Sequence, residues 1–387
     1  MVYSPTVMEL AVAIAYAMID KQHPLTVATH LIRGFTRYVN LTEAEIQVLF
    51  PLVAARLCLS VCISWYQQKE EPDNLHLSIS EDGAWQLLHK LRDIHPRFAH
   101  YVFRDACGLP PCPQTEKVTQ WLSQQTFAPI LGKPFTEENC IVLDFSMGTQ
   151  LLGHVKEFAD PVEFSRRVDQ AAGDKIGIGR YNEARPIYTH DMFTVDHHER
   201  RAVHMAVDIC QPAGTPIYAP LAGRVYSVYD NAGEQDYGPT VILEHQPQPD
   251  ITFYTLYGHL HPDVLGELQQ GQIIAQGQLL AKVGNFPRNG NWFPHLHFQV
   301  MVDLLDNQHE FPGVVSSRHR QVWLAISPNP NIILNIPYEV EAIPAQSKMD
   351  ILNTRKEHLN PSMSISYRKP LTIERGYMHY LYDSDGW

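Results

Sequence analysis

The stretch Phe293–Phe298 constrains the fold of this chain more than any other feature of its sequence. In an extended strand successive side chains point to opposite faces, so His295 and His297 share one face. Leu296 and Phe298 point the other way, into packing. The sequence therefore predicts a β-strand that packs on one side and presents two imidazoles side by side on the other.

Two further motifs supply residues of the same kind. His204 and Asp208 lie four residues apart, a spacing that also returns both side chains to one face of a strand. His259 follows directly after Tyr257 and Gly258. A catalytic zinc site uses three protein ligands and an open position for water, with further imidazoles left for proton and charge work. Together the motifs predict such a site.

Taken singly, none of these motifs identifies a zinc site. Two histidines at this spacing are usually exposed or hydrogen-bonded in a core, and Tyr257 alone is more often a core aromatic. The zinc interpretation depends on the ordered combination within about 95 residues. The other histidines near these motifs are expected to be surface residues: His197, His198, His245 and His261. Of these, His197 or His198 is a lesser candidate for contact with a groove.

In order and surroundings the motifs resemble those of the lysostaphin/LytM-type zinc metallopeptidases. The likeness extends from Ile187 to Leu304 and includes flanking segments typical of that family: Ala213–Pro220 before Gly223–Val225, Gly238–His245 before Thr255–Leu260, and Gly271-Gln272 with Gly277-Gln278 before Val283-Gly284. The resemblance implies a mainly antiparallel sheet of the duplicated hybrid, barrel-sandwich-like type. With the helical N-terminal domain predicted from periodicity, the expected fold class is α+β.

The resemblance also implies a role for each polar residue. Zn²⁺ would be bound by His204, Asp208 and His297, with water in the fourth position. His259 and His295 would orient or deprotonate that water and stabilise the oxyanion. Tyr257 would add a hydrogen bond.

Two departures from the family pattern concern the substrate more than the fold. Ala206 replaces a favoured glycine, and the segment Asn289–Pro294 replaces a glycine-rich turn. Trp292 and Phe293 would add bulk at the edge of the groove. We therefore expect a substrate that differs in shape from glycine-rich cell-wall bridges.

Three functions remain open from the sequence. The first is a zinc-dependent metalloendopeptidase or amide hydrolase, for which peptidoglycan-type peptides are one candidate substrate. The alternative is a non-catalytic zinc-binding module with a regulatory or scaffolding role; retention of all five polar residues favours catalysis. A phosphocarrier is the third, and Asp208 counts against it because a carboxylate is a poor neighbour for a phosphohistidine.

The N-terminal region, residues 1–108, is predicted to be helical. Thr42 and Glu45 form a capping-box pattern, and Pro51 is expected to kink or restart the helix that follows. Segments His30–Phe35 and Leu41–Glu45 resemble the helical C-terminal end of aminoglycoside-phosphotransferase-like kinases. The glycine-rich loop, strand lysine and catalytic aspartates of phosphoryl transfer are missing, so this region cannot be a kinase by itself.

The remaining segments are predicted from turn residues and periodicity. Residues 109–140 form a connector with a short helix at Val118–Gln124, and residues 141–340 form the zinc domain, whose first strands pack onto its core, residues 187–304. Within it, the polar stretch from Arg180 to Pro186 is expected to be a solvated loop rather than part of the groove. The domain is expected to close with a strand at Phe311–Val314. The chain is then expected to leave the domain through a proline-rich segment, Val322–Pro330.

Residues 341–387 are predicted to be a linker followed by a hairpin. The stretch Arg375–Trp387 resembles the opening hairpin of class III PLP-dependent aminotransferases. Kinase-like and aminotransferase-like pieces at the two ends suggest part of a longer fusion, and an open reading frame continuing past Trp387 would support this.

Composition limits the partners and the cellular compartment. The net charge of −12, without a basic stripe, argues against nucleic-acid binding. The six cysteines, without an export signal, predict reduced thiols and a cytoplasmic protein. No uncharged run approaches the length of about 20 residues that a membrane span needs, so no membrane partner is expected.

Overall fold

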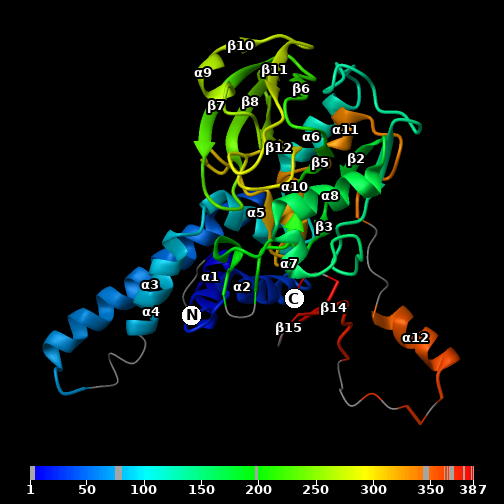
Figure 1. Cartoon of the computed structure of the whole chain (residues 1–387). Helices are drawn as coiled ribbons and strands as arrows, with labels where there is room; N and C mark the ends of the chain where they lie inside the picture. Colours follow the sequence, from blue (N-terminus) through cyan, green and yellow to red (C-terminus); the bar gives the residue numbers. More distant parts are fainter. Residues whose placement is uncertain are drawn as a thin grey trace. The chain divides into compact units, whose positions relative to one another are not determined.

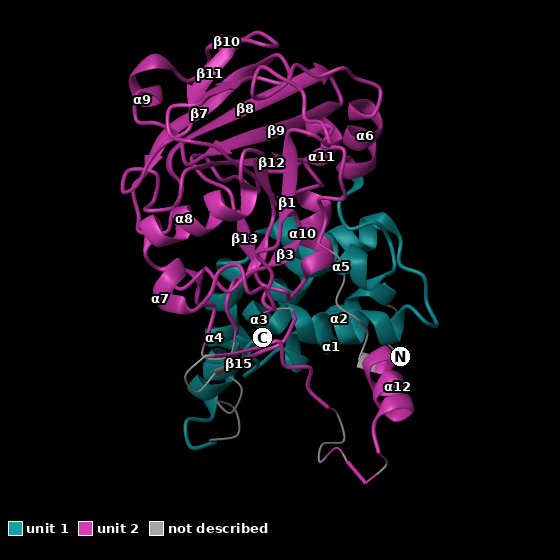
Figure 2. Cartoon of the chain, turned by 45° about the vertical axis from the view of Figure 1, so that its right-hand side comes forward, with its two compact units in different colours: residues 1–113 teal, residues 114–387 magenta. Residues whose placement is uncertain are grey.

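The computed structural model describes residues 5–74, 81–196, 199–342 and 348–386, the last range with gaps at 361, 364, 366–369, 378–379 and 385. The chain divides into two compact units, Met1–Pro113 and Gln114–Trp387 (Figure 2). The boundary lies inside the connector expected from the sequence. Each unit is described by itself below.

Unit 1 is helical throughout its described residues. Its third helix begins at the expected capping box, in which the Thr42 hydroxyl and the Glu45 carboxylate bond each other's backbone amides. The helix runs through Pro51 without the predicted restart. The helices are α1 (Thr6–Ala17), α2 (Pro24–Phe35), α3 (Glu43–Glu70), α4 (Glu81–Arg92) and α5 (Pro96–Ala106).

Helix α3 is long and apolar, and it buries one face. Its buried residues recur at helical spacing from Ile46 to Val61, whereas Leu59, Ile63 and Trp65 are exposed. Among the described residues it is the one helix whose length and composition would allow it to cross a membrane, and a third of its most apolar window is buried. Core helices of soluble proteins pass the same test.

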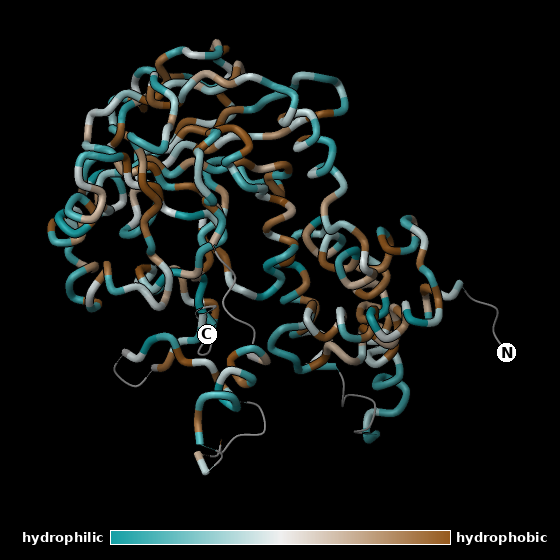
Figure 3. The backbone as a smooth tube through the Cα atoms, turned by 90° about the vertical axis from the view of Figure 1, so that its right-hand side faces the viewer, coloured by the Kyte–Doolittle hydropathy of each residue, from teal (hydrophilic) through white to brown (hydrophobic). Residues whose placement is uncertain are grey.

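Unit 2 is built on a mainly antiparallel sheet, as predicted (Figure 1). Within the described residues the sheet has eight strands in the order β1-β2-β5-β12-β9-β8-β7-β10, and β1 with β2 is its parallel pair. Every residue of β5 and β12 is buried, and Figure 3 shows hydrophobic stretches of the backbone alternating with hydrophilic ones along the chain. The strands are β1 (Cys140–Leu143), β2 (Ile176–Gly179), β5 (Val207–Cys210), β7 (Gly223–Asn231), β8 (Gly238–Gln248), β9 (Ile251–Gly258), β10 (Ile273–Ile274) and β12 (His295–Met301).

Smaller sheets complete unit 2. Strand β6 (Pro216–Tyr218) pairs with β11 (Leu279–Lys282). A three-stranded sheet has β4 (Val203–His204) between β3 (Glu183–Ala184) and β13 (Val314–Val315). It brings residues from before and after the zinc motifs alongside His204.

Helices occupy several segments for which strands or linkers were predicted. Helix α8 (Pro161–Ala172) lies in the region expected to be strands, where Asp160 caps it and Pro161 fills its first position. Helix α10 (Arg320–Ile326) covers much of the segment Val322–Pro330, where a proline-rich irregular stretch was expected. Helix α12 (Lys348–His358) lies in the expected linker.

The other short elements fit the expected layout more closely. The connector helix α6 (Pro113–Leu122) begins five residues earlier than predicted, since proline is favoured in the first turn of a helix. The C-terminal hairpin, β14 (Arg375–Tyr377) and β15 (Tyr380–Tyr382), forms where one was expected. Within the described residues, the remaining short helices are α7 (Val155–Phe158), α9 (Val264–Glu267), α11 (Asn331–Leu334) and the 3-10 helix η2 (Asp191–Phe193).

Candidate metal centre

Strand β12 carries the two histidines of the central motif into the middle of the sheet. It lies between β5 and β9, and all seven of its residues are buried. Its register sets His297 opposite Asp208 on one side and Gly258 on the other. The alternation predicted for this strand is thus confirmed.

His204 and Asp208 do not share one strand, which corrects the sequence interpretation. The chain leaves β4 after His204 and enters β5 at Val207, so the two side chains come from different sheets. They meet because the chain turns at Met205 and Ala206. His204 and Asp208 are therefore in contact because the chain turns between β4 and β5, and not because they share one face of a single strand.

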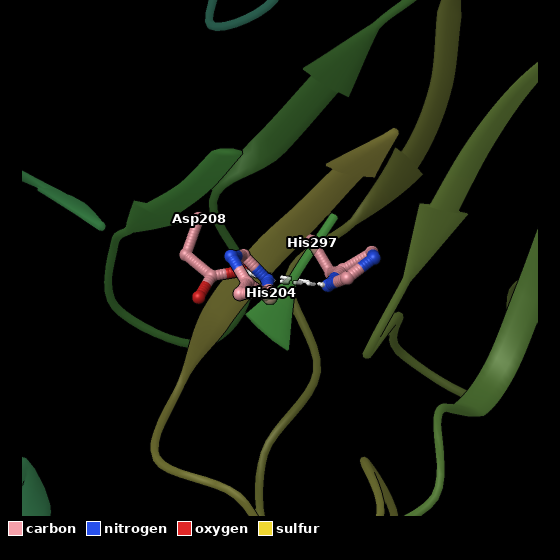
Figure 4. Close-up of side chains that lie close together, drawn as sticks. All are labelled: His204, Asp208 and His297. Carbon is pink, nitrogen blue, oxygen red and sulfur yellow. Dashed lines mark hydrogen bonds and ion pairs between the residues drawn. The ribbon is translucent and has the colours of Figure 1, made fainter. Parts of the chain in front are cut away.

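Three side-chain atoms converge on one point at this corner (Figure 4). His204 Nε2 lies 3.2 Å from His297 Nδ1 and 3.2 Å from Asp208 Oδ1, and the last two atoms are 3.5 Å apart. A tetrahedral ion with ligands at about 2.0–2.1 Å separates those ligands by about 3.3 Å. The three groups are therefore spaced as zinc ligands are, and they form a buried group able to hold a metal ion.

The outer nitrogens of both histidines are held by acceptors. His204 Nδ1 donates to the Arg180 carbonyl over 3.0 Å, and His297 Nε2 donates to Gln299 Oε1 over 3.1 Å. The Gln299 amide is fixed in turn by donation to the Pro312 carbonyl and Ser327 Oγ. Each imidazole therefore directs a lone pair inward, the arrangement that metal-binding histidines require.

Asp208 is ionised, and one of its two carboxylate oxygens has a hydrogen-bond partner. Burial opposes its charge, but the neighbouring His204 and Arg185 hold its pKa well below the usual range. Oδ2 accepts from Arg185 Nη1 over 2.6 Å, whereas buried Oδ1 has no hydrogen-bond partner. An unsatisfied carboxylate oxygen is costly in a protein interior. A bound cation would satisfy it, so the residues fit a metal ion.

Two further histidines face the same point. His259 adopts a left-handed φ of 61° after Gly258, and its Nδ1 donates to the Asn289 carbonyl over 2.9 Å. His295 Nδ1 donates to the Phe293 carbonyl over 2.7 Å. The two rings are 4.4 Å apart, and His295 Nε2 is 3.7 Å from Asp208 Oδ1. Burial lowers the pKa of both imidazoles, so both are neutral at pH 7 with an unprotonated Nε2.

Tyr257 does not lie with these residues, contrary to its predicted role. It pairs with Phe298, and its hydroxyl receives a hydrogen bond from Thr255 Oγ1 on the face of the sheet away from the metal centre. Tyr237 occupies the position beside the centre instead. Its ring packs edge-on to His297 at 5.1 Å, and its hydroxyl donates to the Phe311 carbonyl.

A cavity of about 150 Å³ opens beside the candidate metal ligands. One wall is apolar and aromatic, with Tyr188 5.0 Å from Phe193 and 5.9 Å from Trp292 between ring centres. Arg201, Asp236 and Glu310 line another part of the cavity. The bulk predicted at Trp292 is therefore present beside the site. His197 and His198 lie outside the described residues.

Sequence reasoning missed Arg185, Gln299 and Tyr237. Arg185 was assigned to a solvated loop, yet its side chain is 1% exposed and it bonds Asp208, a candidate metal ligand. Gln299 continues the alternation of His295 and His297 along β12, and this spacing of two was the available signal. Tyr237 directly precedes the family-typical segment Gly238–His245, but it belongs to none of the histidine motifs.

With this geometry established, part of the chain can be matched to a family. Residues 202–310 match the model of Peptidase family M23. We call these residues the M23 segment. It contains all three candidate ligands together with His259 and His295, and it excludes Arg185.

Parts of two solved structures are similar to part of this chain. A zinc-containing peptidase from Vibrio cholerae is 26% identical, with 31% of each chain covered and a TM-score of 0.23. The catalytic domain of lysostaphin from Staphylococcus simulans is 21% identical, with 35% of this chain and 80% of its own covered and a TM-score of 0.24.

The curated relatives belong to a different class. Hydroxylysine kinases of Bos taurus and Mus musculus are each 35% identical over 95 residues, 24% of this chain and 25% of theirs. The chain therefore spans about a quarter of the length of the curated relatives it matches. The kinase-like resemblance is supported in part, and the aminotransferase-like resemblance stays a prediction.

Proposed function

We propose that unit 2 is a zinc-dependent metallopeptidase or amide hydrolase. The observation that carries the proposal is the convergence of His204, Asp208 and His297 at distances of 3.2–3.5 Å, with Asp208 Oδ1 lacking a hydrogen-bond partner. The match of residues 202–310 to Peptidase family M23 supports the same class of reaction. Zn²⁺ is the proposed cofactor because imidazole and carboxylate are its usual ligands.

The metal and the protein contribute different parts of the chemistry. Bound Zn²⁺ would polarise the substrate carbonyl and lower the pKa of water toward about 7. His204, Asp208 and His297 would hold the ion. All three line the cavity, where the scissile bond would bind.

His259 and His295 are the proposed proton-transfer groups. Because each Nδ1–H donates to a backbone carbonyl, each Nε2 carries a lone pair directed at the centre. One Nε2 accepts the proton of the attacking water. Once protonated, Nε2–H donates to the oxyanion and later to the leaving amine.

The cavity wall favours a particular class of substrate. Tyr188, Phe193 and Trp292 are each less than a tenth exposed and line the space beside the ligands. A polyglycine chain has no side chain to fill this space, whereas a large apolar side chain would bury surface against it. We propose peptides or amides with such a side chain next to the scissile bond.

The test combines metal analysis with hydrolysis by the full chain. Wild-type protein should contain about one zinc per chain, as a single catalytic site binds one ion. Asp208→Ala should lose the zinc, since it removes a ligand. His295→Ala should keep the zinc and lose about 100-fold or more in kcat on peptides with large apolar side chains. His261→Ala, which changes a partly exposed histidine that pairs with Asp263, is the matched control.

The outcomes separate the proposals. Absence of zinc from the wild type, even after zinc is added, would overturn the hydrolase proposal. Zinc that is bound without hydrolysis of any substrate in a broad peptide and amide panel would favour the non-catalytic module. Loss of zinc from His295→Ala would mean that the roles of His295 and His297 are reversed.

A further inference from the structure

Arg185 contacts the carboxylate ligand of the metal centre from outside the M23 segment. Its side chain is 1% exposed, and Nη1 donates to Asp208 Oδ2 over 2.6 Å. Nε donates to Glu183 Oε2 over 2.8 Å, and Nη2 donates to the Arg180 carbonyl over 2.9 Å. All three guanidinium nitrogens are thus engaged, and the group is fixed in one orientation.

The segment around Arg185 also contacts His204, a second candidate ligand. The Arg180 carbonyl that accepts from Arg185 also accepts from His204 Nδ1 over 3.0 Å. Glu183 pairs with His204 in the ladder between β3 and β4. Residues 180–185 therefore connect two of the three candidate ligands, although they precede the M23 segment in sequence.

We infer that Arg185 is a positioning residue that makes Asp208 a ligand through one oxygen. This inference rests on the metal site proposed above. A carboxylate can bind a cation with both oxygens, but Oδ2 is occupied by Arg185. Oδ1 is left to face His204 and His297. Binding through Oδ1 alone preserves the fourth position of the ion, which the reaction needs for water and substrate.

The charge of Arg185 and its contact with Asp208 are expected to affect zinc affinity in opposite directions. A cation near the site repels a metal ion, so charge alone predicts tighter zinc binding when Arg185 is removed. Glu183, itself 1% exposed, pairs with Arg185 and offsets that charge. We therefore expect the loss of position to dominate, since removal of an outer partner of a metal ligand commonly weakens metal binding by about 10–100-fold.

The test compares Arg185→Gln and Arg185→Lys in the full chain. Zinc affinity is measured by competition with a chelating dye, and the visible absorption of the Co²⁺-substituted protein reports coordination number. We expect Arg185→Gln to bind zinc about 10–100-fold more weakly and to give a weaker cobalt spectrum, because Asp208 is free to bind with both oxygens. Arg185→Lys keeps the charge and one donor, so it should fall between this variant and the wild type.

Arg201→Gln is the matched control. Arg201 lines the same cavity and donates to the Met192 carbonyl, without a contact to Asp208. Its replacement removes a nearby charge and should leave the cobalt spectrum unchanged. Near-UV circular dichroism of each metal-free variant checks folding. If Arg185→Gln does not fold, the Lys variant carries the test, with a weakened cobalt spectrum as the expected result.

Failure of the inference alone can be distinguished from failure of the proposed function. Wild-type protein without zinc would overturn the proposed function, and this inference with it. Wild-type protein that binds zinc, with Arg185 variants that bind it equally or more tightly and give the wild-type cobalt spectrum, would overturn the inference alone.

Discussion

Because Gly313 has no Cβ, the backbone at this position can lie close to the His297 imidazole. A Cβ at this position would lie 2.1 Å from the Tyr237 hydroxyl and 2.9–3.0 Å from two atoms of the His297 ring. The Tyr237 hydroxyl is already bonded to the Phe311 carbonyl, so it has little freedom to move. The methyl group would displace the imidazole from its bond to Gln299. We expect Gly313→Ala to weaken zinc binding by about tenfold, measured by chelator competition.

Gly266→Ala controls for the change from glycine to alanine. A Cβ on Gly266, in α9, would have no atom within 4 Å. This variant should bind zinc as the wild type does. Unchanged zinc affinity in Gly313→Ala would show that the Tyr237 and His297 side chains adjust at no cost to the site.

The candidate ligands were predictable from sequence because each belongs to a short local motif. The structure brings His204, Asp208 and His297 together as the resemblance implied. Arg185 was not predictable, since its contact with Asp208 depends on how β3 pairs with β4 in three dimensions. A buried arginine between two carboxylates looks in sequence like an exposed polar loop.

At the scale of elements, His245 joins three neighbouring strands. It lies on β8, and its Nδ1 bonds the Ala222 carbonyl just before β7, while its Nε2 bonds Thr255 Oγ1 on β9. Burial lowers its pKa to about 4, against about 6.5 in an unfolded chain. Below pH 6.5 the unfolded chain binds a proton that the folded chain does not. The free energy of unfolding therefore falls as the pH decreases from 6.5 toward 4.

The prediction is a change in the slope of stability against pH. Between pH 7 and pH 5 this histidine should cost about 2 kcal/mol of unfolding free energy. His245→Gln should be less stable than the wild type at pH 7, because hydrogen bonds are lost. Its stability should also fall less between the two pH values. Urea denaturation at pH 7 and pH 5 measures both effects, and equal slopes in the two proteins would contradict the assignment.

Element type was predictable where local signals and tertiary structure agree. The capping box at Thr42 and the alternation along β12 both persisted in the fold. Helices α8 and α10 were missed because the turn residues after them, Gly173 and Pro328, were given more weight than their helical periodicity. The corner between β4 and β5 was missed because spacing alone does not distinguish a continuous strand from a turn between two sheets.

At the scale of the whole molecule, the α+β class was predictable because helical periodicity and strand alternation occupy separate parts of the sequence. The division at Pro113 falls where prolines follow the last helix of unit 1. Every candidate ligand lies in unit 2, on β4, β5 and β12. Zinc should therefore stabilise unit 2 and leave unit 1 unaffected.

Calorimetry of the full chain with and without zinc tests this separation. An ion that binds only the folded state at 100 times its dissociation constant adds about 2.7 kcal/mol, which raises the melting temperature of a domain this size by about 5–10 °C. We expect one unfolding transition to move upward with zinc and another to stay fixed. In Asp208→Ala neither should respond, since the carboxylate that completes the site is gone. A shift of equal size in Asp208→Ala would assign the bound zinc to a site other than the centre at His204 and His297.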